Sequence, residues 1–176
     1  SLVIFNSKYN VKRCKFVKFE GGSRPEHIKV HNELLMKHNP KVIVEIGFNT
    51  GVSAMNFMSK SNETVVISFD IMFHLYSSYA KMYVDEKYPG RHTLVGGDST
   101  KTIPTFTKMF KDLKADLIFI DGSHTLSAAY QDIVNCKEFA HEDTIVVIDN
   151  VVPHRGVGVE VYDAMLRTIQ DDGIVN

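Results

Sequence analysis

The sequence predicts an α/β fold with a doubly wound, mostly parallel sheet and helices on both faces. Short runs rich in Val, Ile, Leu and Phe alternate along the chain with longer stretches that have the period of a helix. The apolar runs are nearly continuous, which is typical of parallel strands covered on both faces. Repeated strand–helix–strand units of this kind cross over right-handed into one sheet.

The individual elements follow from this alternation. Strands are predicted where apolar and β-branched residues run together, at Lys41–Ile46, Thr64–Phe69, His92–Val95, Ala115–Ile120 and Thr144–Ile148. Helices are predicted where the apolar residues have helical spacing, at Pro25–His38, Gly51–Lys60, Phe73–Tyr88, Ser99–Phe110, Thr125–Phe139 and Gly156–Gln170. Residues 25–176 are expected to form one domain, preceded by an N-terminal extension at residues 1–24.

The overall composition argues against several kinds of partner. At 176 residues, 44% hydrophobic and 23% charged, the chain has the make-up of a soluble globular domain. A formal net charge of −1 gives no reason to expect nucleic acid or an anionic membrane as the partner. The basic residues between Lys8 and Lys18 are interrupted by apolar ones and are interpreted as a solvated face.

The sequence favours a reducing, cytoplasmic location. No apolar stretch approaches the ~18 residues that span a bilayer, and no signal peptide is visible. Cys14 and Cys136 are too few for a disulfide framework and lack metal-ligand spacing. Cys136 lies among apolar neighbours in a helical pattern, so a buried free thiol is expected there.

A glycine turn joins the Lys41–Ile46 strand to the following helix. Gly47 and Gly51 permit a tight turn and the close approach of a ligand to the backbone. The free N–H groups at the helix N-terminus and the Ser53 hydroxyl together suit a carboxylate. The spacing Gly-x-x-x-Gly differs from the Gly-x-Gly-x-x-Gly that holds a pyrophosphate, and a turn without a ligand is the alternative.

Polar residues also end the next two strands. Asp70, about 20 residues past the glycine turn, is placed to hydrogen-bond a ribose, or else it caps the helix that follows. Gly97, Asp98 and Ser99 follow the third strand, where the hydroxyl of Ser99 or of Thr100 could meet an adenine edge. A plain helix cap is the alternative for this segment.

Acidic residues end the last two predicted strands. Asp121 follows one of them, and Asp149 and Asn150 follow the other. Because the carboxyl ends of parallel strands meet at one edge of the sheet, these side chains should lie together as hard oxygen ligands for Mg²⁺ or Ca²⁺. His124 lies one helical turn beyond Asp121, where it can face the same space as a base. The alternatives are helix caps for the aspartates and a surface position for His124.

Taken together, these segments resemble the class I S-adenosylmethionine-dependent methyltransferases, with their Rossmann-like sheet, over most of the chain. More narrowly, they look like the cation-dependent O-methyltransferases that act on catechols, sugars and macrolides. The family's Glu-x-Gly-x-x-x-Gly-x-Ser turn holds the methionine part of the cofactor, its acidic residue after the second strand takes the ribose, and its Gly-x-Ser-x-x-x-Ile-Pro segment lies against adenine. That segment matches Gly97, Ser99, Ile103 and Pro104.

The resemblance implies a role for each matched residue. The cofactor-binding residues that it implies are Glu45, Gly47, Asn49, Gly51, Ser53, Asp70, Gly97, Asp98, Ser99 and Asp121. The metal ligands that it implies, for Mg²⁺ before other cations, are Asp121, Asp149 and Asn150. His124 stands at the position of the catalytic base.

The resemblance also implies methyl transfer from S-adenosylmethionine to a hydroxyl of a small molecule. Catechol-type enzymes carry Lys at the place of His124, whereas several sugar and macrolide enzymes have Asp-x-x-His as this chain does, which favours a sugar or natural-product acceptor. A homo-oligomer is compatible with the sequence. The family's C-terminal antiparallel hairpin does not follow by Asn176, so the domain is expected to be C-terminally incomplete.

Three other functions stay open at this level. An NAD-linked enzyme on a similar sheet is opposed by the glycine spacing. A methyltransferase acting on base nitrogens is opposed by Ile120-Asp121-Gly122-Ser123, where such enzymes have Asn/Asp-Pro-Pro-Tyr/Phe. A non-catalytic cofactor-binding domain is compatible with the short C-terminus.

Several aromatic and basic residues are further candidates. His74 and Tyr76 could flank an adenosine, with helix packing as the alternative. His154 and Arg155 could reach the acceptor, with a solvated loop as the alternative. The remaining histidines show no clustering in the sequence.

Overall fold

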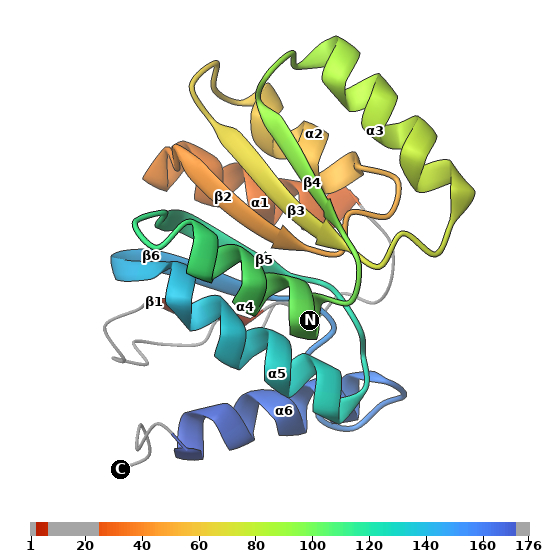
Figure 1. Ribbon diagram of the computed structural model, residues 1–176. Coiled ribbons are helices and arrows are strands. Elements are labelled where there is room, and N and C mark those ends of the chain that lie inside the picture. Colours follow the sequence, from red (N-terminus) through yellow and green to blue (C-terminus); the bar gives the residue numbers. More distant parts are fainter. Residues whose placement is uncertain (1–2, 7–24, 172–176) are drawn as a thin grey trace.

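The computed structural model describes residues 3–6 and 25–171 and has one central sheet with helices on both faces (Figure 1). The strands are β1 (Val3–Asn6), β2 (Val42–Ile46), β3 (Val65–Asp70), β4 (His92–Gly96), β5 (Ala115–Ile120) and β6 (Ala140–Ile148). The helices are α1 (Pro25–His38), α2 (Val52–Ser59), α3 (Leu75–Lys87), α4 (Ser99–Met109), α5 (Leu126–Cys136) and α6 (Gly158–Asp171), with a short 3₁₀ turn at Lys137–Phe139.

The strand order is β1-β6-β5-β2-β3-β4. Strands β2 to β6 run parallel to one another, and β1 pairs with β6 antiparallel at the edge of the sheet. From β2 the chain builds outward through β3 and β4, then returns to place β5 on the other side of β2. The order of strands therefore reverses between β2 and β5, and in sheets of this type ligands bind beyond the carboxyl ends of the strands at that point.

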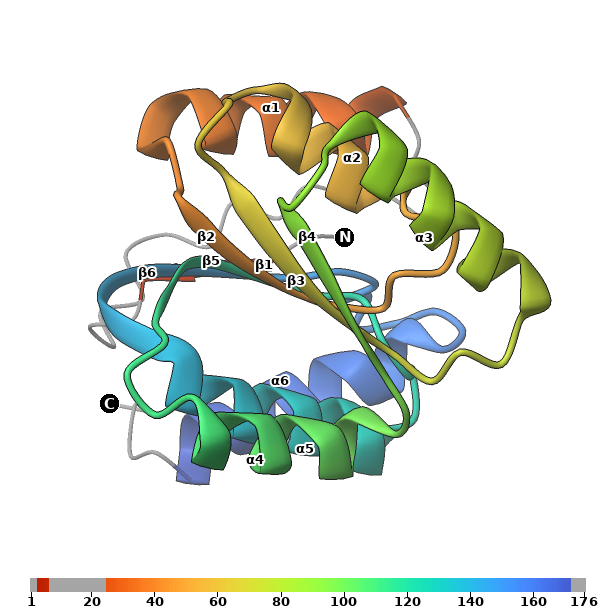
Figure 2. The ribbon, with the colours of Figure 1, turned by 45° about the horizontal axis from the view of Figure 1, so that its top comes forward.

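Two apolar cores fill the spaces between the sheet and its two helical layers. Figure 2 shows α1, α2 and α3 over one face and α4, α5 and α6 over the other. Ile43, Phe57 and Leu117 belong to the first core. Phe69 and Phe139 belong to the second. Coverage on both faces explains why the parallel strands are nearly continuous in apolar residues.

The predicted fold class is confirmed, and each predicted strand and helix is present, Pro25–His38 and Ala115–Ile120 with the predicted bounds and the others with shifted ends. Strand β6 begins at Ala140 instead of Thr144, because Ala140 already pairs with Ala115. The polar residues 141–143 that follow lie at a register shift in the pairing with β5, so this part of the strand has no apolar run. Strand β1 was not predicted, since it is a short segment inside the stretch expected to be an extension. The structure therefore adds an edge strand to the predicted sheet.

The structure describes the residues of only some of the other predictions. Cys136 is a buried free thiol, as expected. Cys14 and the basic residues between Lys8 and Lys18 lie outside the described residues. Across residues 3–6 and 25–171, none of the helices has the length and apolar character needed to cross a membrane.

Candidate functional site

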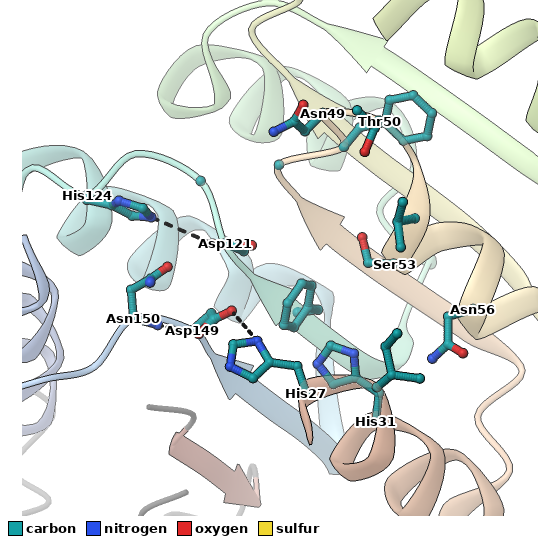
Figure 3. Close-up of a pocket in the computed structure, with 16 residues that line it drawn as sticks. His27, His31, Asn49, Thr50, Ser53, Asn56, Asp121, His124, Asp149 and Asn150 are labelled. Atoms are coloured by element: carbon teal, nitrogen blue, oxygen red, sulfur yellow. Dashed lines mark hydrogen bonds and ion pairs between the residues drawn. The ribbon is translucent and has the colours of Figure 1, made fainter. Parts of the chain in front are cut away.

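A pocket with a volume of about 350 Å³ lies at the carboxyl ends of the central strands (Figure 3). One wall is the glycine turn after β2 together with the start of α2. Another wall is formed by the residues that follow β5 and β6, and α1 closes a third side. The predicted residues that line the pocket are Gly47, Asn49, Ser53, Asp121, His124, Asp149 and Asn150. The pocket thus joins the glycine turn, the acidic residues and the candidate base.

The glycine turn is packed tightly against the end of β5. Gly47 has a φ of +96°, and a Cβ atom added there would lie 2.1 Å from the carbonyl oxygen of Asp121. The backbone N–H of Asp121 donates to the carbonyl of Ile46 at 2.9 Å, which holds the two strand ends together. Gly51, with a φ of +72°, starts α2 and has no room for a Cβ atom against the Phe48 ring. Glycine is therefore required at both positions by conformation and by space.

Glu45 lies behind the pocket and not in its wall. Its side chain is fully buried, and it accepts hydrogen bonds from the hydroxyls of Ser53 and Ser68, the latter at 2.5 Å. Burial raises the pKa of Glu45 to about 7, although the two serine hydrogen bonds act in the opposite direction. Glu45 thus orients Ser53, which lines the pocket.

Asp70 braces the glycine turn from the end of β3. Its Oδ2 accepts the backbone N–H groups of Phe48 at 2.9 Å and Asn49 at 2.8 Å, and its Oδ1 accepts that of Met72 at 2.7 Å. Helix α3 begins after His74, so Asp70 does not cap it and that alternative is wrong. Asp70 does not line the pocket.

The segment after β4 forms a helix cap. Asp98 is the N-cap of α4 and accepts the backbone N–H of Thr100 at 3.1 Å. Ser99 lies beside Asp132, a buried carboxyl on α5. Burial raises the pKa of Asp132 to about 6, with the Ser99 hydroxyl opposing the change. The cap predicted as an alternative is present, and Gly97, Asp98 and Ser99 lie outside the pocket.

The acidic residues lie side by side because of the strand register. Ile120 on β5 pairs with Ile148 on β6, so Asp121 and Asp149 follow at the same level of the sheet. Asp149 is buried, and its Oδ1 accepts the backbone N–H of Asn150 at 2.6 Å. Burial raises the pKa of Asp149, and the Asp121 carboxylate raises it further. The two carboxylates thus both line the pocket, close enough for their charges to interact.

His124 stands next to this acidic pair. Its Nε2 lies 3.6 Å from Oδ1 of Asp121, and its side chain is 38% exposed. The Asp121 side chain raises the pKa of His124, while partial burial lowers it and the Asp149 carboxylate raises it further. Figure 3 shows His124 and Asp121 linked at one side of the pocket. The geometry places an imidazole where it can accept a proton and where an adjacent carboxylate stabilises the resulting cation.

Two histidines of α1 belong to the pocket and were not foreseen. His27 and His31 lie one turn apart on the helix, and both line the pocket opposite the glycine turn. The expectation that the other histidines show no clustering is therefore wrong. The spacing His-x-x-x-His was a signal for one shared helix face, but only the packing of α1 onto the sheet shows that this face meets the acidic pair.

The other candidates lie outside the pocket. His74 and Tyr76 stack on one another, with ring centroids 4.6 Å apart, and both are exposed. His154 and Arg155 are exposed in the segment that leads to α6.

The donor set at the acidic pair fits a hard divalent cation. Asp121, Asp149 and Asn150 offer two carboxylates and an amide oxygen, the ligands that Mg²⁺ and Ca²⁺ prefer. In the described part of the chain no group of three or more His, Cys, Asp or Glu side chains is arranged to hold a metal. The fit therefore rests on the oxygen chemistry of this trio and on two carboxylates whose mutual repulsion a cation would relieve.

Comparison with solved structures shows that the fold is shared with O-methyltransferases. A protein from Staphylococcus aureus provisionally described as a caffeoyl-CoA O-methyltransferase has a TM-score of 0.71 and 21% identity, over 87% of this chain and 77% of that one. CalS11, a TDP-rhamnose 3'-O-methyltransferase of calicheamicin biosynthesis, has a TM-score of 0.70 and 17% identity, over 84% and 71%. An O-methyltransferase from Bacillus cereus in complex with SAH has a TM-score of 0.70 and 15% identity, over 88% and 71%.

The family is shown by the sequence itself. No curated protein gives a significant match to the chain. A family model described as a methyltransferase domain matches residues 44–151, which run from β2 to just past Asp149 and Asn150 and carry the glycine turn, Asp121 and His124. The resemblance to class I methyltransferases is thereby confirmed, and this chain belongs to that methyltransferase-domain family.

Proposed function

We propose that this chain is an S-adenosylmethionine-dependent, divalent-cation-dependent O-methyltransferase that acts on a hydroxyl of a small molecule. The observation that carries the proposal is the single pocket that joins the glycine turn, the Asp121–Asp149 pair and His124. Several structural neighbours were solved with SAH or SAM bound, among them the Bacillus cereus enzyme and TomG from Streptomyces achromogenes. CalS11 acts on a sugar nucleotide and TomG functions in tomaymycin synthesis, which supports a sugar or natural-product acceptor.

The cofactor is assigned to the residues on the glycine-turn side of the site. Gly47, Asn49, Gly51 and Ser53 take the methionine part, with Glu45 holding Ser53 from behind. Asp70 takes the ribose while it braces the turn. Its carboxylate already accepts three backbone N–H groups, and two carboxylate oxygens have about four lone-pair sites, so capacity for a ribose hydroxyl remains.

The adenine is assigned to the α4 side of the site. Gly97, Asp98 and Ser99 lie at the end of β4 and the start of α4, next to the end of β3 where Asp70 stands. This assignment separates the adenine from the pocket and leaves the pocket for the sulfonium end and the acceptor.

Methyl transfer from a sulfonium is a direct displacement. The acceptor oxygen forms a bond to the methyl carbon, the carbon–sulfur bond breaks, its electron pair stays on sulfur as a neutral thioether, and the hydroxyl proton goes to the imidazole of His124, whose Nε2 faces Asp121. Asp121 then lies beside the imidazolium that forms. When bound, a divalent cation would lower the pKa of the acceptor hydroxyl. Asp121, Asp149 and Asn150 are the residues that would hold it, and the pocket walls align the reacting groups.

The test is a turnover assay with S-adenosylmethionine across sugar, phenol and polyketide hydroxyls, each with and without Mg²⁺. We expect methylated product with a sugar or polyketide acceptor, loss of turnover in excess EDTA, and recovery on addition of Mg²⁺. The Asp149→Ala variant should lose both turnover and the response to Mg²⁺. Full activity in excess EDTA would exclude the role of the cation, and no affinity for S-adenosylhomocysteine would exclude methyl transfer altogether.

A further inference from the structure

A histidine from outside the matched family region lies against the acidic pair. His27, in the first turn of α1, is only 2% exposed. Its Nδ1 lies 3.5 Å from Oδ2 of Asp149. Figure 3 shows the imidazole below the carboxylate, on the side of Asp149 away from His124. The acidic pair is therefore flanked by one histidine on each side, each close to a different aspartate.

The two oxygens of Asp149 have different neighbours. Oδ1 accepts the backbone N–H of Asn150 at 2.6 Å, whereas Oδ2 faces His27. The bond from Asn150 holds Oδ1 from within the same turn. The contact with His27 comes from a different layer of the fold and meets the second oxygen, Oδ2.

We propose that His27 is a positioning residue that orients the Asp149 carboxylate toward the divalent cation by presenting its Nδ1–H to Oδ2. This inference rests on the proposed function, because it needs a cation at Asp121, Asp149 and Asn150. Groups that hydrogen-bond to a ligating side chain set its orientation, and their removal typically costs about 10- to 100-fold in metal affinity. The role of His27 is thus to act through Asp149 and not on the acceptor.

His31 provides a matched control from the same helix face. It is also buried and lines the same pocket one turn further along α1. Its ring, however, packs against Phe119 with centroids 4.9 Å apart and against Phe57 at 5.4 Å. A change at His31 therefore disturbs the packing of α1 without removing the side chain that contacts Asp149.

The experiment measures Mn²⁺ affinity of the full chain by electron paramagnetic resonance, with S-adenosylhomocysteine affinity measured by calorimetry in parallel. His27→Phe keeps a buried ring without the donor, His27→Asn keeps an N–H near the position of Nδ1, and His31→Leu is the control. We expect the Kd for Mn²⁺ to rise about 10- to 100-fold in His27→Phe. We expect His27→Asn to recover most of the affinity and His31→Leu to bind Mn²⁺ as the wild type does, with little change in S-adenosylhomocysteine affinity throughout.

The outcomes separate this inference from the function on which it rests. Wild-type Mn²⁺ affinity in His27→Phe would overturn the positioning role and leave the cation site standing. Equal losses in His27→Phe and His31→Leu would also overturn it, because they would show a general loosening of α1. Absence of Mn²⁺ binding in the wild type would overturn both the cation site and this inference, while S-adenosylhomocysteine binding still tests the methyltransferase. If His27→Phe does not fold, His27→Leu serves in the same comparison.

Discussion

Oδ2 of Asp70 accepts the backbone N–H of Asn49 at 2.8 Å, so the residue that ends β3 holds the turn that follows β2. The same oxygen also accepts the N–H of Phe48. The acidic residue that the sequence assigns to ribose thus has a second role in shaping the turn. Cofactor affinity and local stability should be coupled at this position.

We expect Asp70→Ala to lower both the free energy of unfolding and the affinity for S-adenosylhomocysteine. Three backbone N–H groups lose their acceptor, and hydrogen bonds to charged groups contribute roughly 1.5–3 kcal/mol each, with solvent replacing part of that loss. Urea unfolding and calorimetric titration measure the two effects. Asp70→Asn, which keeps one acceptor oxygen, should fall between the wild type and Asp70→Ala. Wild-type stability of Asp70→Ala would contradict the bracing role.

Gly47→Ala should damage the protein far more than Gly90→Ala. Both glycines have a positive φ, +96° and +72°, but a Cβ at Gly47 would overlap the Asp121 carbonyl whereas a Cβ at Gly90 meets no atom within 4 Å. Gly90→Ala should therefore cost only the conformational strain, about 1–2 kcal/mol. Gly47→Ala must in addition push apart the ends of β2 and β5, and we expect it to abolish S-adenosylhomocysteine binding. Similar melting temperatures and cofactor affinities for the two variants would be inconsistent with this geometry.

Glu45 should make the stability of the fold depend on pH. Its pKa is raised from 4.5 to about 7 in the folded chain by burial, so the folded state holds a proton that the unfolded state has already released. Its contribution to stability is fully present below pH 4.5 and is lost as the pH rises to 7, by roughly 3 kcal/mol. The measurement is the difference in free energy of unfolding between the wild type and Glu45→Gln across this range.

The difference measurement is needed because two histidines act in the opposite direction. Burial lowers the pKa of His31 and of His92 to about 4, so each contributes stability that is lost as the pH falls below 6.5 toward 4. Both residues remain in Glu45→Gln. The effect of His31 cancels in the difference, and that of His92 cancels as long as the substitution leaves its contact with Ser68, which donates to Glu45, in place. A difference that stays constant between pH 4.5 and 7 would show that Glu45 is ionised in the folded state.

His124→Ala should lose turnover and keep cofactor affinity. General-base catalysis contributes about 10²- to 10⁴-fold, so we expect a fall in kcat of that order with an unchanged Kd for S-adenosylhomocysteine. His154→Ala is the comparison, because His154 is exposed and does not line the pocket. A rise in KM in His154→Ala would show that this loop reaches the acceptor. Full turnover of His124→Ala would remove His124 from the mechanism.

Much of the fold could be predicted because its strands and helices produce local patterns of apolar residues in the sequence. The parallel strands are covered on both faces, and this makes runs such as Ala115–Ile120 apolar at nearly every position. Strand β1 could not be predicted in this way, since its four residues gain their structure only by pairing with β6. A short edge strand carries too little pattern of its own to be identified.

The sequence predicted those residues of the site that directly follow the ends of strands. Asp121 and Asp149 meet because their strands are neighbours with Ile120 opposite Ile148, which a parallel order implies. The contribution of His27 depends instead on how α1 packs across the sheet, and no spacing in the sequence reports that distance. Glu45 was expected to bind the cofactor, but its burial behind Ser53 is a property of the packed strand.

The antiparallel edge strand limits how the chain can be shortened. Val3 of β1 pairs with Ile148, the residue immediately before Asp149, so β1 covers the outer edge of the strand that carries the acidic pair. A bare strand edge presents unpaired N–H and C=O groups that recruit strands from other molecules. Trimming residues 1–6 would turn β6 into such an edge, and the strand that ends in the pocket would then present its unpaired groups to other molecules.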